Sequence, residues 1–457
     1  MAKEWVEHAM WWHVYPLGFV GAPIRERSGE NGVIHRLARI ENWLDHLVAL
    51  GLNGLALGPV FASATHGYDT VDHLAIDPRL GDEADFERLV AAARERGVRI
   101  LLDGAFNHVG RSHPAFRVLE EQGPDAATAG LFRVRWDDWK PGDPVDADVF
   151  EGHDQLVALD HDSPAVEDLV VEVMVHWLDR GADGWRLDAA YAMPASFWAR
   201  VLPRVREAHP ECWIVGEILH GDAAEIVRES TMDSVTQYEL WQGIWHGIAD
   251  ANFFELKHAV ERDNALLADF VPATFVGNHD VTRIASAVGD PRHLAHAVVL
   301  LFTLAGTPSV YAGDEFALTG VKEQRIGGDD AVRPEFPDMP PAEGDLEPAA
   351  REALELHRRL IALRRRHPWL HRAHSDVVHV TNTAIVIRTA TASEAVVVAL
   401  NLADEPVSVP SAGAESVVAG SVDGEVGPDI VLPAHGWAVL VAGAAAPSDQ
   451  PEAAAQR

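Results

Sequence analysis

The chain has 457 residues, of which 47% are hydrophobic and 23% are charged, so it can bury a large core. Its 70 acidic residues outnumber 37 basic ones, and the formal net charge of −33 opposes binding to nucleic acid. The single cysteine, Cys212, excludes an intrachain disulfide, and the longest apolar stretch, Ala297 to Ala305, is too short to span a bilayer. Residues 1–8 lack the layout of a signal peptide. We therefore expect a cytoplasmic protein that binds neither nucleic acid nor membranes.

Short β-type runs alternate with longer helical runs up to about residue 365. Eight strands that are each followed by a helix predict an α/β fold, the (β/α)8 TIM barrel, whose chemistry lies at the C-terminal ends of its strands. A doubly wound sheet is the alternative, but the chain has no Gly-rich nucleotide-binding turn. The predicted strands are Trp11–Tyr15, Asn53–Leu57, Arg99–Asp103, Gly184–Asp188, Trp213–Glu217, Ser234–Tyr238, Ala273–Asn278 and Pro308–Tyr311. The predicted helices include Asp82–Arg96, Pro164–Arg180, Pro194–His209, Pro291–Leu304 and Glu347–Arg366.

Two regions depart from this alternation. Residues 109–160 are rich in Pro, Gly and Asp and are too long for a simple loop, so they predict a short inserted subdomain after the third strand. The barrel then comprises residues 1–108 and 161–366. Residues 367–443 carry short β-branched runs and predict a C-terminal all-β sandwich domain, and we expect residues 444–457 to be a disordered tail.

Acidic residues end several of the predicted strands. Asp103, Asp188 and Glu217 end the third, fourth and fifth strands, and Asp280 lies just beyond the seventh. A single acid after a strand is often only a helix cap, but four of them at one end of a barrel indicate a site. Arg186 lies two residues before Asp188 and so points to the same side of the strand. The same rim carries two Asn-His pairs, Asn107-His108 and Asn278-His279.

These segments resemble the α-amylase family of glycoside hydrolases. The resemblance runs in family order from about Trp11 to Glu315. Within the family, His66–Asp72, Leu102–His108 and Leu156–Asp160 look most like neopullulanases, cyclomaltodextrinases and maltogenic amylases. The N-terminal domain through which those relatives dimerise is expected to be lacking, because the first strand begins near Trp11, and we expect a monomer or a weak homo-oligomer. The matching segments are Gly67–Asp72, Asp77–Gly81, Asp103–His108, Gly184–Asp188, Gly216-Glu217, Gly277–Asp280 and Gly306–Glu315.

The resemblance implies a retaining hydrolase that cleaves α-1,4-glucosidic bonds of maltooligosaccharides, cyclodextrins or related α-glucans. Asp188 would be the nucleophile, Glu217 the general acid and then base, and Asp280 a brace for the sugar hydroxyls. Arg186 would keep Asp188 ionised, because a nearby cation lowers the pKa of a carboxyl. The residues expected to bind substrate are Tyr68, His108, Arg186 and His279, with Asp103 behind them holding Arg186. We also expect Asp314 and Glu315 to anchor the eighth-strand loop, and Arg333 to order the loop after it.

Three points stay open. A transglycosylase of the same fold, of the 4-α-glucanotransferase or isomerising type, would share these acids, and so would a barrel enzyme turned into a catalytically inactive sugar-binding scaffold. The Lys-His pair that many endo-acting relatives carry is absent after Asp188, and Asp160 replaces the usual Asn, so chain-length preference and endo or exo action are undetermined. No cofactor is expected to be required and no catalytic metal is expected. A structural Ca²⁺ near Asn107 is compatible with the acidic insertion, for which a solvated acidic loop is the alternative.

Overall fold

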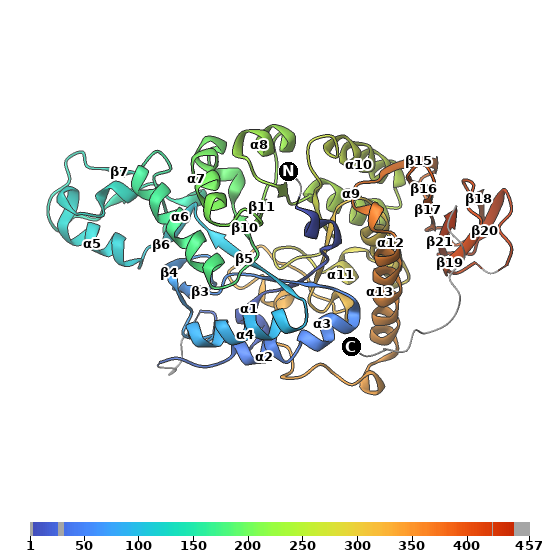
Figure 1. Ribbon diagram of the computed structural model, residues 1–457, viewed down its shortest axis with the longest axis horizontal. Coiled ribbons are helices and arrows are strands. Elements are labelled where there is room, and N and C mark those ends of the chain that lie inside the picture. Colours follow the sequence, from blue (N-terminus) through green and yellow to red (C-terminus); the bar gives the residue numbers. More distant parts are fainter. Residues whose placement is uncertain (1–2, 26–31, 423, 443–457) are drawn as a thin grey trace.

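The computed structural model describes residues 3–25, 32–422 and 424–442. Eight parallel strands follow one another in chain order around a barrel. A parallel bridge between Thr236 and Ala273 closes the barrel between its sixth and seventh strands. The predicted (β/α)8 barrel is therefore confirmed (Figure 1). Its strands are β1 (Trp11–Val14), β2 (Gly54–Leu57), β5 (Arg99–Ala105), β10 (Gly184–Asp188), β11 (Trp213–Gly216), β12 (Ser234–Val235), β13 (Ala273–Phe275) and β14 (Thr307–Tyr311).

Helices cover the outside of this barrel, and their starts follow local capping rules. Asp82 caps α4 by accepting a hydrogen bond from the Asp85 amide, and the Asp85 side chain accepts one from the Asp82 amide. Ser163 caps α6, whose first residue is Pro164. The helices are α1 (Pro16–Phe19), α2 (Leu37–Glu41), α3 (Leu44–Leu50), α4 (Glu83–Glu95), α6 (Pro164–Asp179), α7 (Ala195–Ala208), α8 (Ala223–Ser230), α9 (Tyr238–Ala249), α10 (Phe253–Leu266), α11 (Ile284–Ala287), α12 (Leu294–Thr303) and α13 (Pro348–Arg366).

Two predicted strands extend three residues too far at their C-terminal ends, and the first and fifth extend one residue too far. The sixth stops at Val235, because the Gln237 side chain accepts a hydrogen bond from the Leu240 amide and starts α9 at Tyr238. The seventh stops at Phe275, which leaves Asn278 in the loop that follows. Apolar runs indicate where a strand passes through the core, but they do not indicate where a capping residue ends the strand and starts the next helix.

The predicted insertion leaves the barrel between β6 (His108–Gly110) and β9 (Leu156–Ala158), which pair antiparallel at its base. It forms the arm at one end of the molecule in Figure 1. Inside it lie α5 (Pro114–Gln122) and the strand pair β7 (Val134–Arg135) and β8 (Asp146–Ala147). A further strand pair, β3 (Phe61–Ser63) and β4 (Thr70–Ile76), lies in the loop after β2. The sequence patterns did not predict these six strands.

The C-terminal region is an antiparallel five-stranded sheet with a two-stranded sheet beside it. Both faces of its central strand β17 are buried: Val396 and Val398 belong to the core shared with the barrel, whereas Val397 and Ala399 pack with Val409 of the smaller sheet. The predicted tail, residues 444–457, lies outside the described residues. The strands are β15 (His374–Val380), β16 (Ala384–Ala390), β17 (Ala395–Asn401), β18 (Val407–Pro410), β19 (Ser416–Gly420), β20 (Asp429–Leu432) and β21 (Trp437–Ala442).

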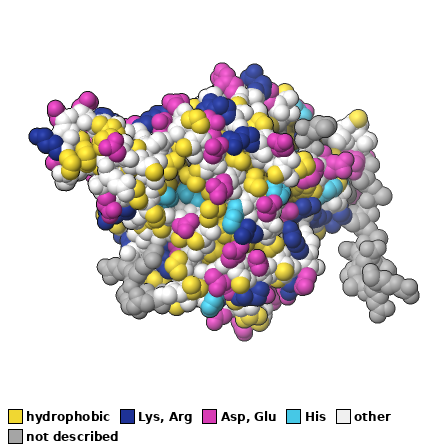
Figure 2. All heavy atoms as spheres, turned by 60° about the vertical axis from the view of Figure 1, so that its left-hand side comes forward, with side chains coloured by type: hydrophobic (Ala, Val, Ile, Leu, Met, Phe, Trp, Pro, Cys, Tyr) yellow, Lys and Arg dark blue, Asp and Glu magenta, His cyan; other side chains and the backbone are white. Residues whose placement is uncertain are grey.

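The surface carries charge of both signs. In Figure 2 acidic side chains are spread over the visible face among basic ones. In the part of the chain that the structure describes, no helix is long and apolar enough to cross a lipid bilayer.

Candidate active site

One guanidinium group connects three carboxylates at the mouth of the barrel. Arg186 in β10 lies directly opposite Asp103 in β5, and its Nη1 donates to both Asp103 oxygens at 2.7 Å. The same Nη1 lies 3.2 Å from Asp188 Oδ1, and Nη2 lies 2.6 Å from Glu217 Oε1. The expected contact between Asp103 and Arg186 is therefore present. Adjacent parallel strands bring the four side chains together, because their carboxyl ends share one edge of the barrel.

Glu217, which directly follows β11, is held from two further directions. The Ala189 amide donates to its Oε2 at 3.0 Å, and the Tyr238 hydroxyl donates to its Oε1 at 3.1 Å. The Asn278 side-chain amide in turn donates to the Tyr238 hydroxyl at 2.9 Å. Sequence patterns did not indicate Tyr238 as a site residue. Its position at the end of the predicted sixth strand was the signal that could have indicated it.

Asp280 lies across the mouth from this group and is fixed by two cationic or polar neighbours. Arg333 Nη2 donates to its Oδ1 at 2.7 Å, and His279 Nε2 lies 3.0 Å from its Oδ2. Burial raises the pKa of Asp280, but His279 and Arg333 outweigh it and hold the pKa well below its ordinary value. Arg333 was expected only to order the loop after β14. It also donates to the His279 carbonyl at 2.9 Å, and so it positions the Asp280 segment directly.

The aromatic residues of the site form a stack. The His279 ring lies between Tyr15 and Tyr68, with ring centres 5.7 Å and 5.5 Å away. The Tyr68 hydroxyl contacts His279 Nε2 and donates to Asp103 Oδ2 at 3.1 Å. Both rings are nearly fully buried. Tyr68 and His279 thus belong to the same cluster as the acids, while their contacts with a sugar remain predictions.

His108 begins the insertion and stacks on Phe150, with ring centres 4.6 Å apart. Burial, with a smaller contribution from His66, lowers its pKa to about 4, so the ring is neutral near pH 7. Its Nε2 has no hydrogen-bond partner among the described residues. The contact of His108 with a sugar remains a prediction.

The contacts around the insertion do not favour a cation near Asn107. The Asn107 side-chain amide lies 3.2 Å from His108 Nδ1. Of the acids in the insertion, Asp146 and Asp148 contact the Arg135 guanidinium at 2.7 Å and 2.5 Å. Both carboxylates are thus paired with a guanidinium, and these contacts do not identify the several oxygen ligands that Ca²⁺ prefers. Ca²⁺ binding at this place remains an untested prediction, and no chemistry is assigned to it.

Arg186 lowers the pKa of Asp188 as expected, but two opposing effects outweigh it. Burial and repulsion from Glu217 raise the pKa of Asp188, and together they exceed the lowering by Arg186, so that the pKa lies well above its ordinary value. Arg186 is shared between Asp103, Glu217 and Asp188, and Asp188 has the longest of these contacts. A guanidinium shared in this way lowers the pKa of Asp188 by less than burial and the charge of its neighbours raise it.

This raised pKa predicts a pH effect. The nucleophile must be ionised to react, so kcat/KM on maltotriose falls as the pH drops through the raised pKa of Asp188. The acidic side of the pH profile of kcat/KM therefore has its midpoint above the ordinary Asp pKa of about 3.9. Asp103→Asn removes a negative charge that repels Asp188 and lets Arg186 interact more strongly with Asp188. Both effects lower the pKa of Asp188, so the acidic midpoint of the profile moves to lower pH. A pH series of initial rates for both proteins measures this. An unshifted midpoint near pH 4, or a shift upward in the variant, would contradict the assignment.

An open cavity of about 650 Å³ adjoins the site on the side of Glu217. Tyr238, which contacts Glu217, lines it together with the loop after β11. Gln242 and Arg262 contribute polar groups from α9 and α10. Its size is that of a typical small-molecule site.

A parallel barrel with two carboxylates facing each other at its strand ends has the arrangement of a barrel glycosidase. The model of the α-amylase catalytic domain matches residues 23–335, and the chain belongs to the α-amylase family. The resemblance noted in the sequence is thereby confirmed.

Individual relatives support the same placement. The chain is 29% identical over 390 residues to a maltogenic α-amylase of Bacillus acidopullulyticus (81% of this chain, 64% of that protein). It is 30% identical over 342 residues to a cyclomaltodextrinase of a Bacillus species (69% and 60%). It therefore spans less than two thirds of the length of either relative. The solved structure of a cyclic α-maltosyl-(1→6)-maltose hydrolase from Arthrobacter globiformis superposes with a TM-score of 0.80 at 28% identity, covering 97% of this chain and 100% of that one.

Proposed function

We propose that this protein is a retaining α-glycoside hydrolase that cleaves α-1,4-glucosidic bonds of maltooligosaccharides, cyclodextrins or related α-glucans. The proposal depends on one observation: Asp188 and Glu217 end adjacent strands, and both contact the Arg186 guanidinium. Retaining glycosidases need two carboxyl groups about 5–5.5 Å apart, and two carboxylates on one guanidinium support such a spacing.

The reaction then proceeds in two steps. An Asp188 oxygen bonds to the anomeric carbon while the glycosidic C–O bond breaks, and the departing oxygen takes a proton from Glu217. Glu217, now a carboxylate, removes a proton from water, whose oxygen attacks the anomeric carbon and releases Asp188. Asp280, held by Arg333, pairs with sugar hydroxyls and with the positive charge that develops on the ring.

The substrate side of the proposal uses the remaining residues. Tyr68, His108, Arg186 and His279 bind the sugar at the bond to be cleaved, and Asp103 positions Arg186. The names of the maltogenic amylase and the cyclomaltodextrinase support an α-1,4-glucan as substrate. The Arthrobacter hydrolase matches over its whole length, which favours a cyclic α-maltosyl-(1→6)-maltose as a second candidate.

A product time course tests this function. Maltoheptaose, β-cyclodextrin, pullulan, trehalose and cyclic α-maltosyl-(1→6)-maltose are incubated with the protein, and proton NMR follows the anomer released. We expect turnover of maltoheptaose or of a cyclic substrate, with the α-anomer formed before mutarotation. Release of the β-anomer first, or no turnover of any α-1,4-linked substrate, would contradict the proposal.

Transglycosylation is the alternative, in which a sugar hydroxyl replaces water in the second step. The cavity beside Tyr238 is compatible with either reaction, because the same space can hold the departing sugar of a hydrolase or the acceptor sugar of a transferase. At high maltotriose concentration a transferase yields oligosaccharides longer than the substrate, whereas a hydrolase yields only shorter ones. A non-catalytic scaffold is disfavoured because all three catalytic acids are retained.

The remaining properties are proposed from the sequence. We propose that the protein needs no cofactor, is cytoplasmic, binds neither nucleic acid nor membranes, and is a monomer or a weak homo-oligomer. The charge of −33 supports the exclusion of nucleic acid. Light scattering after size exclusion measures the oligomeric state.

A further inference from the structure

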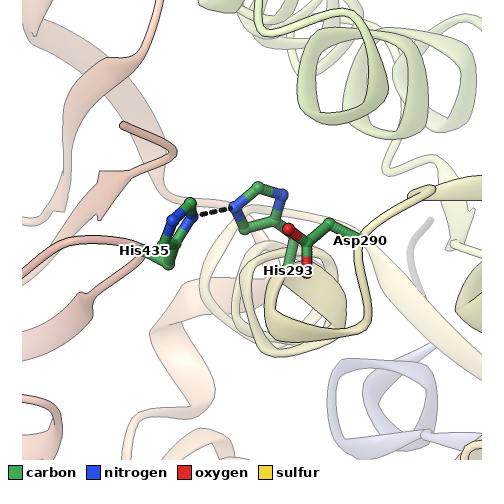
Figure 3. Close-up of side chains that lie close together, drawn as sticks. All are labelled: Asp290, His293 and His435. Atoms are coloured by element: carbon green, nitrogen blue, oxygen red, sulfur yellow. Dashed lines mark hydrogen bonds between the residues drawn. The ribbon is translucent and has the colours of Figure 1, made fainter. Parts of the chain in front are cut away.

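Three side chains with metal-ligating atoms converge where the barrel meets the C-terminal domain (Figure 3). Asp290 and His293 lie just before α12, and His435 lies in the turn before β21. His293 Nε2 and His435 Nδ1 face each other at 3.0 Å, and one ligand atom of each of the three residues lies within 4.8 Å of the others. His293 is buried, and the His435 side chain is only 11% exposed.

A fourth residue orients one of these imidazoles. Asp404 Oδ1 lies 2.9 Å from His435 Nε2, on the side of the ring that faces away from His293. A carboxylate at this position holds the proton on Nε2, so that the Nδ1 lone pair points toward His293. Metal-ligating histidines are commonly held by a carboxylate in this way.

We propose that Asp290, His293 and His435 bind a divalent transition metal ion of the Zn²⁺ type, which joins the barrel to the C-terminal domain. Two nitrogen ligands of tetrahedral Zn²⁺, each about 2.0–2.1 Å from the ion, lie about 3.3 Å apart, so the 3.0 Å between these two nitrogens is already close to the separation of a coordinated pair. Two imidazoles with one carboxylate suit Zn²⁺, whereas Ca²⁺ and Mg²⁺ prefer oxygen ligands.

The surroundings allow a dication. Asp290 accepts a hydrogen bond from the Arg292 amide at 2.9 Å and pairs with the Arg292 guanidinium, whose side chain is 57% exposed. An exposed ion pair contributes little stability, so a metal ion can replace the guanidinium at little cost. Asp290 and Asp404 together supply two negative charges against the two positive charges of the ion. The ion reinforces an interface that His296 already bridges, because His296 Nε2 contacts the Asn401 carbonyl at 3.0 Å.

A second grouping of possible ligands, His35 with Asp82 and Asp85, is less suitable. Asp82 and Asp85 form the capping box of α4, and Arg88 also contacts Asp85. His35 is largely exposed. His35→Ala therefore serves as a control for metal binding at this second grouping.

The test measures Zn²⁺ and Co²⁺ binding to the full chain by calorimetry and by the visible absorption of bound Co²⁺. We expect saturable binding at one site, weakened roughly tenfold or more in His293→Gln and His435→Asn. Asparagine suits position 435 because the backbone there has φ 54°, which Asn tolerates. His35→Ala and the exposed His258→Ala keep the binding of the unchanged protein.

Thermal unfolding supplies a second readout. Zn²⁺ raises the unfolding midpoint of the unchanged protein but not that of His435→Asn. His435 is less deeply buried than His293, so His435→Asn is expected to fold even if His293→Gln does not. Absence of saturable binding, or equal affinity in His435→Asn and His258→Ala, would overturn the proposal. Neither readout involves the glycosidase reaction, so the two proposals fail separately.

Discussion

Asp188→Asn is expected to lower kcat/KM on maltotriose by about 10⁴-fold or more, because no carboxylate then remains to bond to the anomeric carbon. The fold should not suffer. Asp188 is buried among like charges, and burial and Glu217 raise its pKa, so a neutral amide of the same shape removes repulsion. Initial rates give the loss, and the thermal unfolding midpoint near pH 7 should be unchanged or higher.

Glu217→Gln separates the two acidic roles. It should lose activity on maltotriose to a similar degree, because the departing sugar needs a proton. On an aryl maltoside with a dinitrophenyl leaving group, which departs without a proton, it should retain a rapid first step, whereas Asp188→Asn should not. Near-native turnover of maltotriose by either variant would show that the roles are assigned wrongly.

Arg283→Met is expected to destabilise the protein by about 3–5 kcal/mol, because it leaves a buried carboxylate without its cation. Arg283 Nη1 donates to Asp314 Oδ1 at 2.9 Å, and the two side chains are 0% and 2% exposed. The guanidinium also lies 4.3 Å from the centre of the Tyr311 ring. Burial already raises the pKa of Asp314 to about 7 with Arg283 in place, so protonation of Asp314 limits the loss at neutral pH and the full loss is expected only well above pH 7. A lowered thermal unfolding midpoint measures the loss.

Two further variants control for the loss of charge itself. Arg283→Met combined with Asp314→Leu removes both charges and should recover much of the stability. Arg96→Met breaks a surface pair with Asp45, whose side chain is 80% exposed, and should cost no more than about 1 kcal/mol. If Arg283→Met were as mild as Arg96→Met, the buried pair would not hold the loop after β14 as the sequence predicted.

Local patterns were sufficient to predict the barrel strands within a few residues and the acids that follow them. Strands that cross a core must be apolar, and an acid after such a run stands out regardless of what lies around it. Short strands were harder. β7 and β8 are two residues each, and β20 was hidden between turn residues, because strands this short exist only through their partners.

By itself the sequence determined the family, the barrel and the positions of Asp188, Glu217 and Asp280, because these follow from runs and motifs within a few residues. Only the tertiary structure decided that Tyr238 contacts Glu217, that Arg333 fixes Asp280, and that Arg186 divides its charge among three carboxylates. The raised pKa of Asp188 belongs to this second group. Burial and the distances between charges arise from segments far apart in the chain, and no local pattern of residues encodes them.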